Sequence, residues 1–310
     1  MKLRTAAIGV GYMGRYHAQK LAALPASKLV AVVDADAARA GAVAGEFGCA
    51  AETDFRRLLG GLDAACVAVP TEAHHEVVGA LLDAGVHVLV EKPLARTVAE
   101  ADDLLARARA GHLVLQVGHL ERFNPAFRAL AAQPGRALFI DIERLSPFKP
   151  RGTDVDVVLD LMIHDLDLVL ALARSEVQAV SACGFRVLTD AIDIANARIE
   201  FADGCVASVS ASRVSQSAVR KLRVFRHDLY VSADLQGHSL RNVRRAEGGV
   251  AESEARFERT DALAVQTDAF LRAVREKSAP EVSGEEGRRA LHLALRVGEL
   301  IRTRLERVAP

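Results

Sequence analysis

Residues 3–14 read LRTAAIGVGYMG, an apolar run that stops at the first of three glycines spaced G-x-G-x-x-G. The pattern predicts a buried strand that turns directly into a helix. Glycine permits the tight turn, close approach of the backbone to a pyrophosphate, and close packing of helix on strand. The free N–H groups at the start of the helix attract phosphate oxygens. The turn is therefore predicted to bind a dinucleotide through Gly9, Gly11, Tyr12, Met13 and Gly14.

An acidic residue follows at the distance that such a turn requires. Asp34 stands twenty residues after Gly14 and ends a second apolar run, residues 29–33. A carboxylate there accepts hydrogen bonds from the ribose hydroxyls of adenosine and repels a 2′-phosphate. We therefore predict NAD as the cofactor in preference to NADP. Arg39 could reach a 2′-phosphate of NADP, but we interpret it as a solvent-exposed charge on the following helix.

Up to residue 119, short apolar runs alternate with amphipathic stretches. The predicted strands cover residues 3–8, 29–33, 64–69, 86–90 and 113–117, and the predicted helices cover residues 14–24, 35–47, 73–83 and 98–108. Thr97 and Glu100 form a capping box at the start of the last helix. Apolar strands that alternate with helices indicate a parallel sheet covered on both faces. We predict a Rossmann dinucleotide-binding domain over residues 1–119.

The pattern changes after residue 120, where strands follow one another without helices between them. The predicted strands are residues 137–144, 177–187, 194–201, 205–211, 222–225 and 229–231, and the predicted helices are residues 155–173, 262–277 and 284–307. Residues 238–259 are polar and weakly defined. Consecutive strands favour antiparallel pairing. We therefore predict a second, α+β domain over residues 120–310, with a largely antiparallel open sheet plus helices.

Composition excludes several classes of protein. The chain has 310 residues, with 40 basic and 40 acidic side chains, so it lacks the basic excess typical of nucleic-acid binders. The four cysteines are far apart and form no C-x-x-C pair, which argues against a metal site and fits a reducing, cytoplasmic location. No apolar run approaches the ~18 residues of a membrane span. We predict a cytoplasmic protein without a bound metal, nucleic-acid partner or membrane segment.

The predicted helix 155–173 is apolar nearly all round, yet it carries charged residues at helical spacing. Asp156, Asp160, His164 and Asp167 recur at intervals of four, four and three. Unpaired charges on a buried helix are costly. The stripe therefore faces a wet site, or it pairs with basic residues. In the first case His164 is a candidate general base, oriented by Asp160 or Asp167.

A third motif, Glu91-Lys92-Pro93, follows the apolar run 86–90. It therefore stands at the carboxyl end of a predicted parallel strand, the edge at which ligands of α/β sheets bind. Taken by itself, the motif is better explained as a surface Glu–Lys pair before a loop.

The order of these motifs resembles the Gfo/Idh/MocA (glucose-fructose oxidoreductase/inositol dehydrogenase) family. The resemblance rests on the glycine turn, Asp34, residues 70–74 (PTEAH), residues 91–93 (EKP) and Asp160-x-x-x-His164, and it extends from residue 3 to about residue 304. It implies a two-domain NAD(P)-dependent oxidoreductase that acts on a sugar or polyol. Met162 stands where the family often has glycine, which changes how closely a substrate can approach the helix.

The resemblance also implies roles for particular residues. Lys92 would hydrogen-bond the reacting hydroxyl and touch the cofactor, and a cation there would stabilise a developing alkoxide. His164 would take the hydroxyl proton with support from Asp160. The implied cofactor contacts further include Pro70, His74 and Glu91, although His74 could equally be a histidine of a helix surface.

Two further stretches bear on the substrate: residues 118–125 (GHLERFNP) and the loop 147–153. Cations in them could hold a phosphate or a carboxylate, or could simply be exposed loop charges. Both stretches look like family members that oxidise UDP-linked amino sugars. The predicted substrate contacts are therefore Lys92, Arg122, Asn124, Lys149, Arg151, Asp160 and His164.

The sequence thus predicts an NAD-dependent dehydrogenase of a nucleotide sugar, with oxidation at ring carbon C3 of a UDP-N-acetylhexosamine. A free-sugar or inositol dehydrogenase is the first alternative, and a cofactor-binding sensor or regulatory protein without catalysis is the second. The resemblance further implies a homodimer or homotetramer assembled through the C-terminal sheet.

Overall fold

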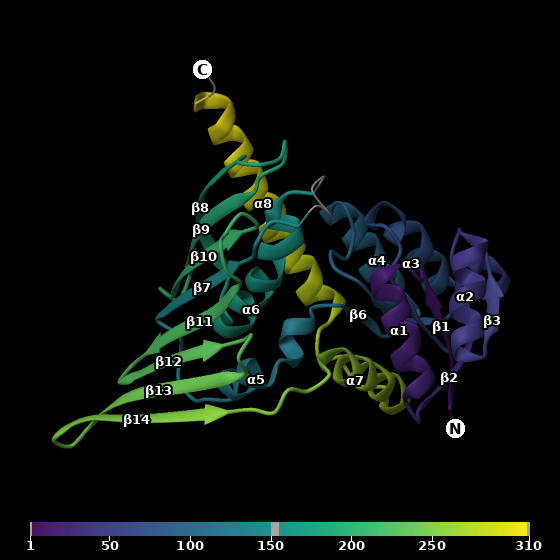
Figure 1. Ribbon diagram of the computed structural model, residues 1–310, viewed down its shortest axis with the longest axis horizontal. Helices are drawn as coiled ribbons and strands as arrows, with labels where there is room; N and C mark the ends of the chain where they lie inside the picture. Colours follow the sequence, from purple (N-terminus) through teal and green to yellow (C-terminus); the bar gives the residue numbers. More distant parts are fainter. Residues whose placement is uncertain (1, 150–154, 309–310) are drawn as a thin grey trace. The chain divides into compact units, whose positions relative to one another are not determined.

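The computed structural model describes residues 2–149 and 155–308, which fold into two compact units (Figure 1). The first unit comprises Met1–Leu120 and Asp261–Leu291, and the second comprises Glu121–Thr260 and His292–Pro310. The chain therefore returns to the first unit near its end, a feature that the predicted division at residues 119 and 120 does not include.

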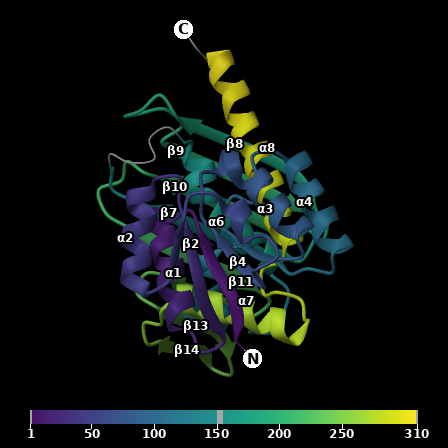
Figure 2. The same cartoon turned by 90° about the vertical axis from the view of Figure 1, so that its right-hand side faces the viewer.

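The first unit is built on a parallel sheet of six strands in the order β3-β2-β1-β4-β5-β6. The strands are β1 (Leu3–Ile8), β2 (Ser27–Val33), β3 (Ala50–Glu52), β4 (Ala64–Val67), β5 (His87–Val90) and β6 (Leu115–Val117). Helices α1 (Tyr12–Ala23) and α2 (Ala37–Phe47) cover one face, and α3 (His74–Asp83) and α4 (Val98–Ala110) cover the other (Figure 2). The predicted Rossmann fold is confirmed. The strand order reverses between β1 and β4, the point beside which such sheets bind ligands.

Local sequence explains where these helices begin and what holds them. The side chain of Asp36 accepts hydrogen bonds from the first amides of α2, and Thr97 caps α4 through the amide of Glu100, at 3.1 Å, as predicted. Helix α7 (Ala262–Glu276) adds Phe270 and Leu271 to the apolar core of this unit. Burying two such side chains contributes about 2 kcal/mol each.

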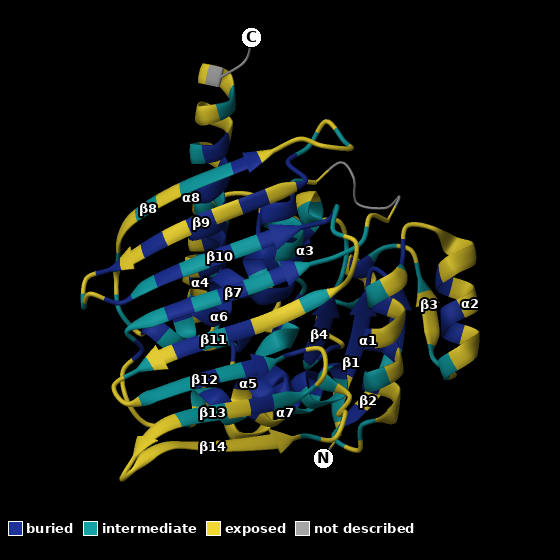
Figure 3. Cartoon of the chain, turned by 60° about the vertical axis from the view of Figure 1, so that its left-hand side comes forward, coloured by how far each residue is buried: buried dark blue, intermediate teal, exposed yellow. Residues whose placement is uncertain are grey.

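The second unit is an eight-stranded sheet in the order β14-β13-β12-β11-β7-β10-β9-β8 (Figure 3). Its strands are β7 (Phe139–Leu145), β8 (Val177–Phe185), β9 (Ile194–Phe201), β10 (Val206–Ser212), β11 (Val219–Arg226), β12 (Leu229–Asp234), β13 (Ser239–Ala246) and β14 (Gly249–Arg256). Strands β7 and β10 pair in parallel, and the other neighbours pair antiparallel. The predicted largely antiparallel sheet is confirmed. Helices α5 (Pro125–Ala131), α6 (Ile163–Ala173) and the end of α8 (Gly284–Val308) complete the unit.

Strands β13 and β14 occupy the segment that was predicted to be weakly defined. Every residue of β14 is exposed, so neither face shows the apolar alternation from which a strand is predicted. Charge pairs between the two strands take the place of apolar contacts, for example Arg241 with Glu252 at 2.7 Å. Lysine and arginine on such edge strands also hinder pairing with other chains.

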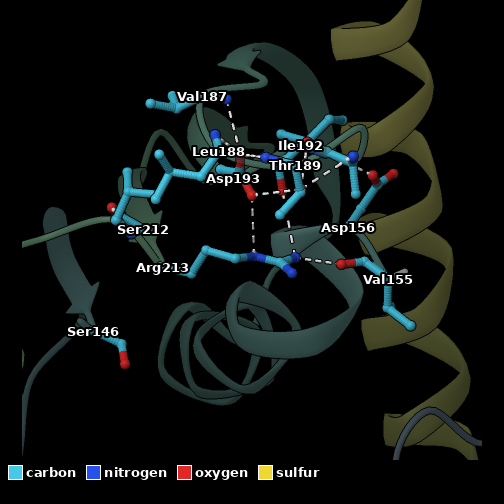
Figure 4. Close-up of polar contacts among 12 residues, drawn as sticks. Ser146, Val155, Asp156, Val187, Leu188, Thr189, Ile192, Asp193, Ser212 and Arg213 are labelled. Carbon is cyan, nitrogen blue, oxygen red and sulfur yellow. Dashed lines mark hydrogen bonds and ion pairs between the residues drawn. The ribbon is translucent and has the colours of Figure 1, made fainter. Parts of the chain in front are cut away.

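A buried carboxylate organises the loop between β8 and β9 (Figure 4). Asp193 is 0% exposed and accepts hydrogen bonds from the amides of Val187, Leu188 and Thr189, at 2.7 to 2.9 Å. The guanidinium of Arg213 lies 3.6 Å from the same carboxylate and donates to the carbonyl oxygen of Val155. One acid and one base thus fix the loop and the chain that leads into α6.

Candidate active site

The glycine-rich turn between β1 and α1 is tightly packed. Gly9 has φ of 79°, and a Cβ atom there would lie 2.7 Å from the carbonyl oxygen of Ala68. A Cβ atom on Gly14 would lie 1.6 Å from the carbonyl oxygen of Gly9, so neither position admits a side chain. Gly11 instead faces open space, with no atom within 4 Å of its Cβ position. Two glycines therefore pack the turn, and the third leaves room for a close ligand.

The start of α1 is available to an anion. Gly11 precedes the helix and has no side chain to cap its first amides, and Tyr12 is 67% exposed while Met13 is half-buried. A cavity of about 630 Å³ opens beside this turn and is lined by Gly9, Gly11, Asp34 and Pro70 among others. An uncapped helix start beside a glycine without neighbours fits the pyrophosphate of a dinucleotide.

The carboxylate of Asp34 lies in this cavity and is 9% exposed. Its Oδ2 accepts a hydrogen bond from the amide of Val10, at 2.9 Å, which ties it to the glycine turn. Its Oδ1 accepts hydrogen bonds from the amide of Asp36 and from Arg39 Nη1, at 3.0 and 3.1 Å. Arg39 also pairs with Asp36, at 3.4 Å. Two carboxylates therefore neutralise Arg39, a cation that could favour a 2′-phosphate, which supports NAD over NADP.

The cavity is also lined by residues that were not predicted from the sequence. Thr53, Asp54, Phe55 and Arg56 line it, from the loop after β3. The guanidinium of Arg56 stacks over the ring of Phe55, with Cζ 4.7 Å from the ring centre, and forms ion pairs with Asp54 and Glu76. Strand β3 has three residues, too few for a recognisable pattern, so nothing in the sequence placed this loop at the site.

Glu91, Lys92 and Pro93 follow β5 directly, as predicted, and the Lys92–Pro93 peptide bond is cis. Lys92 is half-buried. The carboxylate of Glu91 lies 2.7 Å from Nε2 of His17, a residue of α1 that is 1% exposed. Its other oxygen accepts a hydrogen bond from the amide of Lys92, at 3.3 Å. Contact of Glu91 with a cofactor stays a prediction, and its observed contacts are internal to the unit.

His74 is 1% exposed, which excludes the alternative of a surface histidine. Its Nδ1 lies 2.9 Å from the carbonyl oxygen of Pro93, and its Nε2 lies 3.0 Å from that of Val69. Burial lowers the pKa of His74, although the hydrogen bonds with the backbone carbonyl groups favour the protonated ring. The ring thus joins the loops that follow β4 and β5, next to the lining residue Pro70.

In the second unit, the predicted helix 155–173 is not uniform. It opens with a π-helical turn, Val158–Met162, and continues as α6. Such single turns occur frequently at functional sites. Asp160 lies in the turn and His164 in the first turn of α6; both are half-buried, whereas most positions of α6 are buried. Asp160 and His164 are therefore less buried than the other charged residues of this helix, Asp165 and Asp167.

The other acids of the predicted stripe have structural partners. Asp156 accepts a hydrogen bond from the amide of Ile192 and pairs with Arg302, at 3.0 and 3.1 Å. Asp167 is 2% exposed and lies 3.3 Å from Nε of Arg122. The π turn adds one residue to a helical turn, so residues before it, such as Asp156, are rotated about the helix axis relative to the residues of α6. The alternative of pairing with basic residues therefore holds for these two acids.

The buried ion pair of this unit was not predicted. Arg144 of β7 binds Asp165 of α6 with contacts of 2.7 to 3.0 Å, and both are 5% exposed or less. Glu121 accepts from Arg144 and from Arg220, at 3.1 and 3.0 Å. Asp165 adjoins His164 in sequence but lies off the predicted stripe, so spacing did not single it out. The pair fixes the start of α6 to the sheet.

The remaining predicted substrate contacts differ in what surrounds them. Asn124 is 5% exposed; its amide oxygen caps α5, and its nitrogen donates to the carbonyl oxygen of Leu235 at 2.8 Å. Its observed contacts are therefore structural. Arg122 pairs with Asp167, as described, and Lys149 is exposed. Arg151 lies outside the described residues.

Two family models match the chain. One, described as an oxidoreductase family with an NAD-binding Rossmann fold, matches residues 3–119, and the other, described as a GFO/IDH/MocA C-terminal domain, matches residues 98–227. The protein belongs to the Gfo/Idh/MocA family of oxidoreductases, as the sequence motifs indicate. Its first unit contains the NAD-binding Rossmann fold, and its cofactor is NAD.

Known members of the family resemble the chain over its length. The UDP-N-acetylglucosamine 3-dehydrogenase of Acidithiobacillus ferrooxidans is 40% identical, over 98% of this chain and 99% of its own. A solved structure of that enzyme matches with a TM-score of 0.93. The NAD(+)-dependent scyllo-inositol 2-dehydrogenase of Bacillus subtilis is 30% identical, over 69% of this chain and 68% of its own.

Within the described ranges, no helix has both the length and the apolar character that a membrane crossing requires.

Proposed function

We propose that the protein oxidises the C3 hydroxyl of a UDP-N-acetylhexosamine and passes the hydride to NAD. The observation that carries the proposal is the full-length similarity, at 40% identity, to a UDP-N-acetylglucosamine 3-dehydrogenase. The half-buried pair Asp160 and His164 supports the chemistry, because it offers a base and a carboxylate on a helix whose residues are mostly buried.

The proposed reaction divides the work among three side chains. NAD, when bound, accepts the hydride from the carbon that is oxidised. His164 takes the hydroxyl proton, so that the C–H and O–H bonds are lost and a C=O bond forms. Lys92 donates a hydrogen bond to the same oxygen and stabilises its developing negative charge. Asp160 orients the imidazole and favours its protonated form.

The inositol 2-dehydrogenases among the relatives support a second candidate, oxidation of a free polyol. The two candidates differ in the pyrophosphate of the substrate, for which Lys149 and Arg151 are the proposed cationic contacts. Arg122 is a less direct candidate, since its guanidinium is engaged by Asp167. The cytoplasmic location stays a prediction from the sequence.

The test is a panel of substrates with the purified protein and NAD, followed by the absorbance of NADH. UDP-N-acetylglucosamine and UDP-N-acetylgalactosamine are compared with N-acetylglucosamine, UDP-glucose and myo-inositol. We expect reduction with a UDP-N-acetylhexosamine and little with the free sugar or the polyol. Activity with myo-inositol alone would establish the second candidate instead. If the protein binds NAD but none of the five substrates reduces it, the alternative of a cofactor-binding sensor or regulatory protein is favoured. The variant His164→Ala serves as the inactive control.

We further propose that the protein assembles through the outer face of the eight-stranded sheet. Strand β9 alternates exposed and buried residues over its full length, and its buried side faces the core of the unit. Part of the outer face carries aromatic side chains, with Phe139, Phe225 and Tyr230 in one contacting group. A second copy of the chain is the proposed partner.

A further inference from the structure

Two buried histidines contact the tripeptide Glu91–Pro93 from opposite ends of its sequence. His17, from α1, reaches Glu91, and His74, from the start of α3, reaches Pro93. Lys92 is the residue between these contacts. We propose that His17 and His74 are positioning residues, which hold the backbone of Lys92 in the place that the reaction requires. The inference rests on the proposed role of Lys92.

The contact with His17 runs through a carboxylate to the backbone. His17 Nε2 lies 2.7 Å from one oxygen of Glu91, and the other oxygen accepts the amide hydrogen of Lys92. Burial works against a charged imidazole, but the neighbouring groups of Cys66 and Glu91 raise the pKa of His17 to about 10. Burial likewise opposes ionisation of Glu91, yet the hydrogen bond with His17 lowers its pKa. A charged pair is therefore buried beside Lys92.

The carboxylate of Glu91 has little room to move. A Cβ atom on Gly118, the residue after β6, would lie 3.0 Å from Oε2 of Glu91 and 3.1 Å from its Cδ. The backbone of Gly118 therefore packs directly against the carboxylate. The carboxylate of Glu91 is thus held between His17 and Gly118, where it accepts the amide hydrogen of Lys92.

The contact with His74 holds the other end of the tripeptide. Its ring lies between the carbonyl oxygens of Pro93 and Val69, at 2.9 and 3.0 Å. Pro93 is thus tied to the loop after β4, which lines the cofactor cavity at Val69 and Pro70. Buried hydrogen bonds of this kind are costly to break, because the polar group that loses its partner is kept away from water. Both neighbours of Lys92 are therefore fixed to different parts of the sheet edge.

The experiment replaces each histidine in the full-length protein and measures turnover and NAD affinity with the best substrate of the panel. His17→Leu and His74→Leu remove the contacts, and His17→Gln restores a donor to Glu91. A displacement of about 1 Å can cost ~10²-fold in rate. We expect both leucine variants to lose about 10–100-fold in kcat with NAD affinity held within about threefold, and His17→Gln to recover part of the loss.

His75→Leu is the matched control. The imidazole of His75 lies 2.7 Å from a carboxylate, that of Asp103, but this contact is away from the tripeptide. The variant His75→Leu should therefore leave kcat unchanged. Hydrogen exchange of the Lys92 amide, followed in the protein without substrate, gives a second measurement. Exchange should accelerate in His17→Leu and Glu91→Gln and stay unchanged in His75→Leu, because only the first two weaken the acceptor of that amide.

Several results would overturn the inference. The inference is overturned if folded His17→Leu and His74→Leu keep a turnover within about twofold of wild type. It is also overturned if these variants lose NAD affinity by the same factor as turnover. If His17→Leu does not fold, Glu91→Gln, which preserves size, decides the question by the same two measurements. Lys92→Ala is assayed in parallel. Full activity of Lys92→Ala would contradict the catalytic role of Lys92 itself. If Lys92→Ala is inactive while the histidine variants keep full activity, only the positioning role of the two histidines is contradicted.

Discussion

At the scale of single residues, Asp34 decides which dinucleotide the cavity accepts. Its carboxylate binds the amide of Val10 and neutralises Arg39 at the same time. Asp34→Ala removes an acceptor for the ribose hydroxyls and releases Arg39. We expect NAD affinity to fall by about tenfold or more, with NADP affected much less, since hydrogen bonds to charged groups contribute about 1.5–3 kcal/mol.

Calorimetric titration of the protein with NAD and with NADP measures this ratio. Arg39→Gln is the companion variant, and the preference for NAD should survive it. Tighter binding of NADP than NAD by the wild-type protein would contradict the assignment of Asp34.

His164 and Asp160 should differ in how much turnover depends on them. Loss of a general base commonly costs about 10²–10⁴ in rate, so His164→Ala should fall in that range. Asp160→Asn should cost less, because an asparagine still orients the ring and removes only the charge. Neither change should alter NAD affinity, which equilibrium binding checks. An equal loss in both variants would show that Asp160 does more than orient His164.

How far sequence predicts these residues depends on whether their partners are local. The glycine turn, Asp34 and Glu91–Pro93 were predictable, because a strand end and its following turn are adjacent in the chain. His17 and Arg144 were not, since their partners Glu91 and Asp165 come from other elements. A lone histidine in α1 carries no signal until the fold brings a carboxylate to it.

At the scale of elements, the loop between β8 and β9 depends on Asp193. Burial raises the pKa of this carboxyl, but the amides of Val187, Leu188 and Thr189 and the Thr189 hydroxyl lower it to about 2. An unfolded aspartate titrates near ~3.9. Because the folded pKa is the lower one, the stabilisation is complete above about pH 4–5 and is lost as the pH falls towards about 2.

Asp193→Ala should therefore lower the free energy of unfolding by about 3 kcal/mol at neutral pH, since Arg213 and three amides lose their partner. The difference from wild type should shrink as the pH is lowered through about 4. Urea denaturation across this range measures both effects. Asp190, exposed in the same loop, provides the control Asp190→Ala, which should leave stability unchanged. A difference that is independent of pH would contradict the role of the charge.

Elements were predictable where one face is buried. Strand β9 alternates fully, and its predicted bounds, residues 194–201, agree with the structure. Strand β14 buries no residue, and the π turn at Val158–Met162 depends on backbone hydrogen bonds that leave the sequence pattern helical. Strand β14 was therefore not predicted because it has no buried face, and the π turn was not predicted because its sequence has the period of an ordinary helix.

At the scale of the whole molecule, the outer face of the second sheet should govern assembly. Phe225 is 38% exposed there, against Phe139 and Tyr230. Phe225→Asp places a charge in an apolar contact and should shift the protein towards monomer. Sedimentation velocity at micromolar concentration should show at least a dimer for wild type. Phe185→Asp, at the other end of the sheet, tests how far the contact extends; a wild-type monomer would contradict the proposal.

The class of fold could be predicted from the spacing of apolar residues in the sequence. The return of residues 261–291 to the first unit could not be predicted in this way. Helix α7 is amphipathic, and an amphipathic helix can cover either unit equally well. Its destination is decided by contacts such as that of Lys20 with Asp261, at 2.8 Å, between elements far apart in the chain.

The central claim is that a hydride leaves C3 of a UDP-linked amino sugar. It is tested most directly with UDP-N-acetylglucosamine that carries deuterium at C3. We predict that the deuterium is transferred to the nicotinamide, where mass spectrometry finds it in the reduced cofactor, and that turnover slows relative to the unlabelled sugar. Formation of unlabelled NADH, with the deuterium retained at C3 of the product, would contradict the assignment of the reacting carbon.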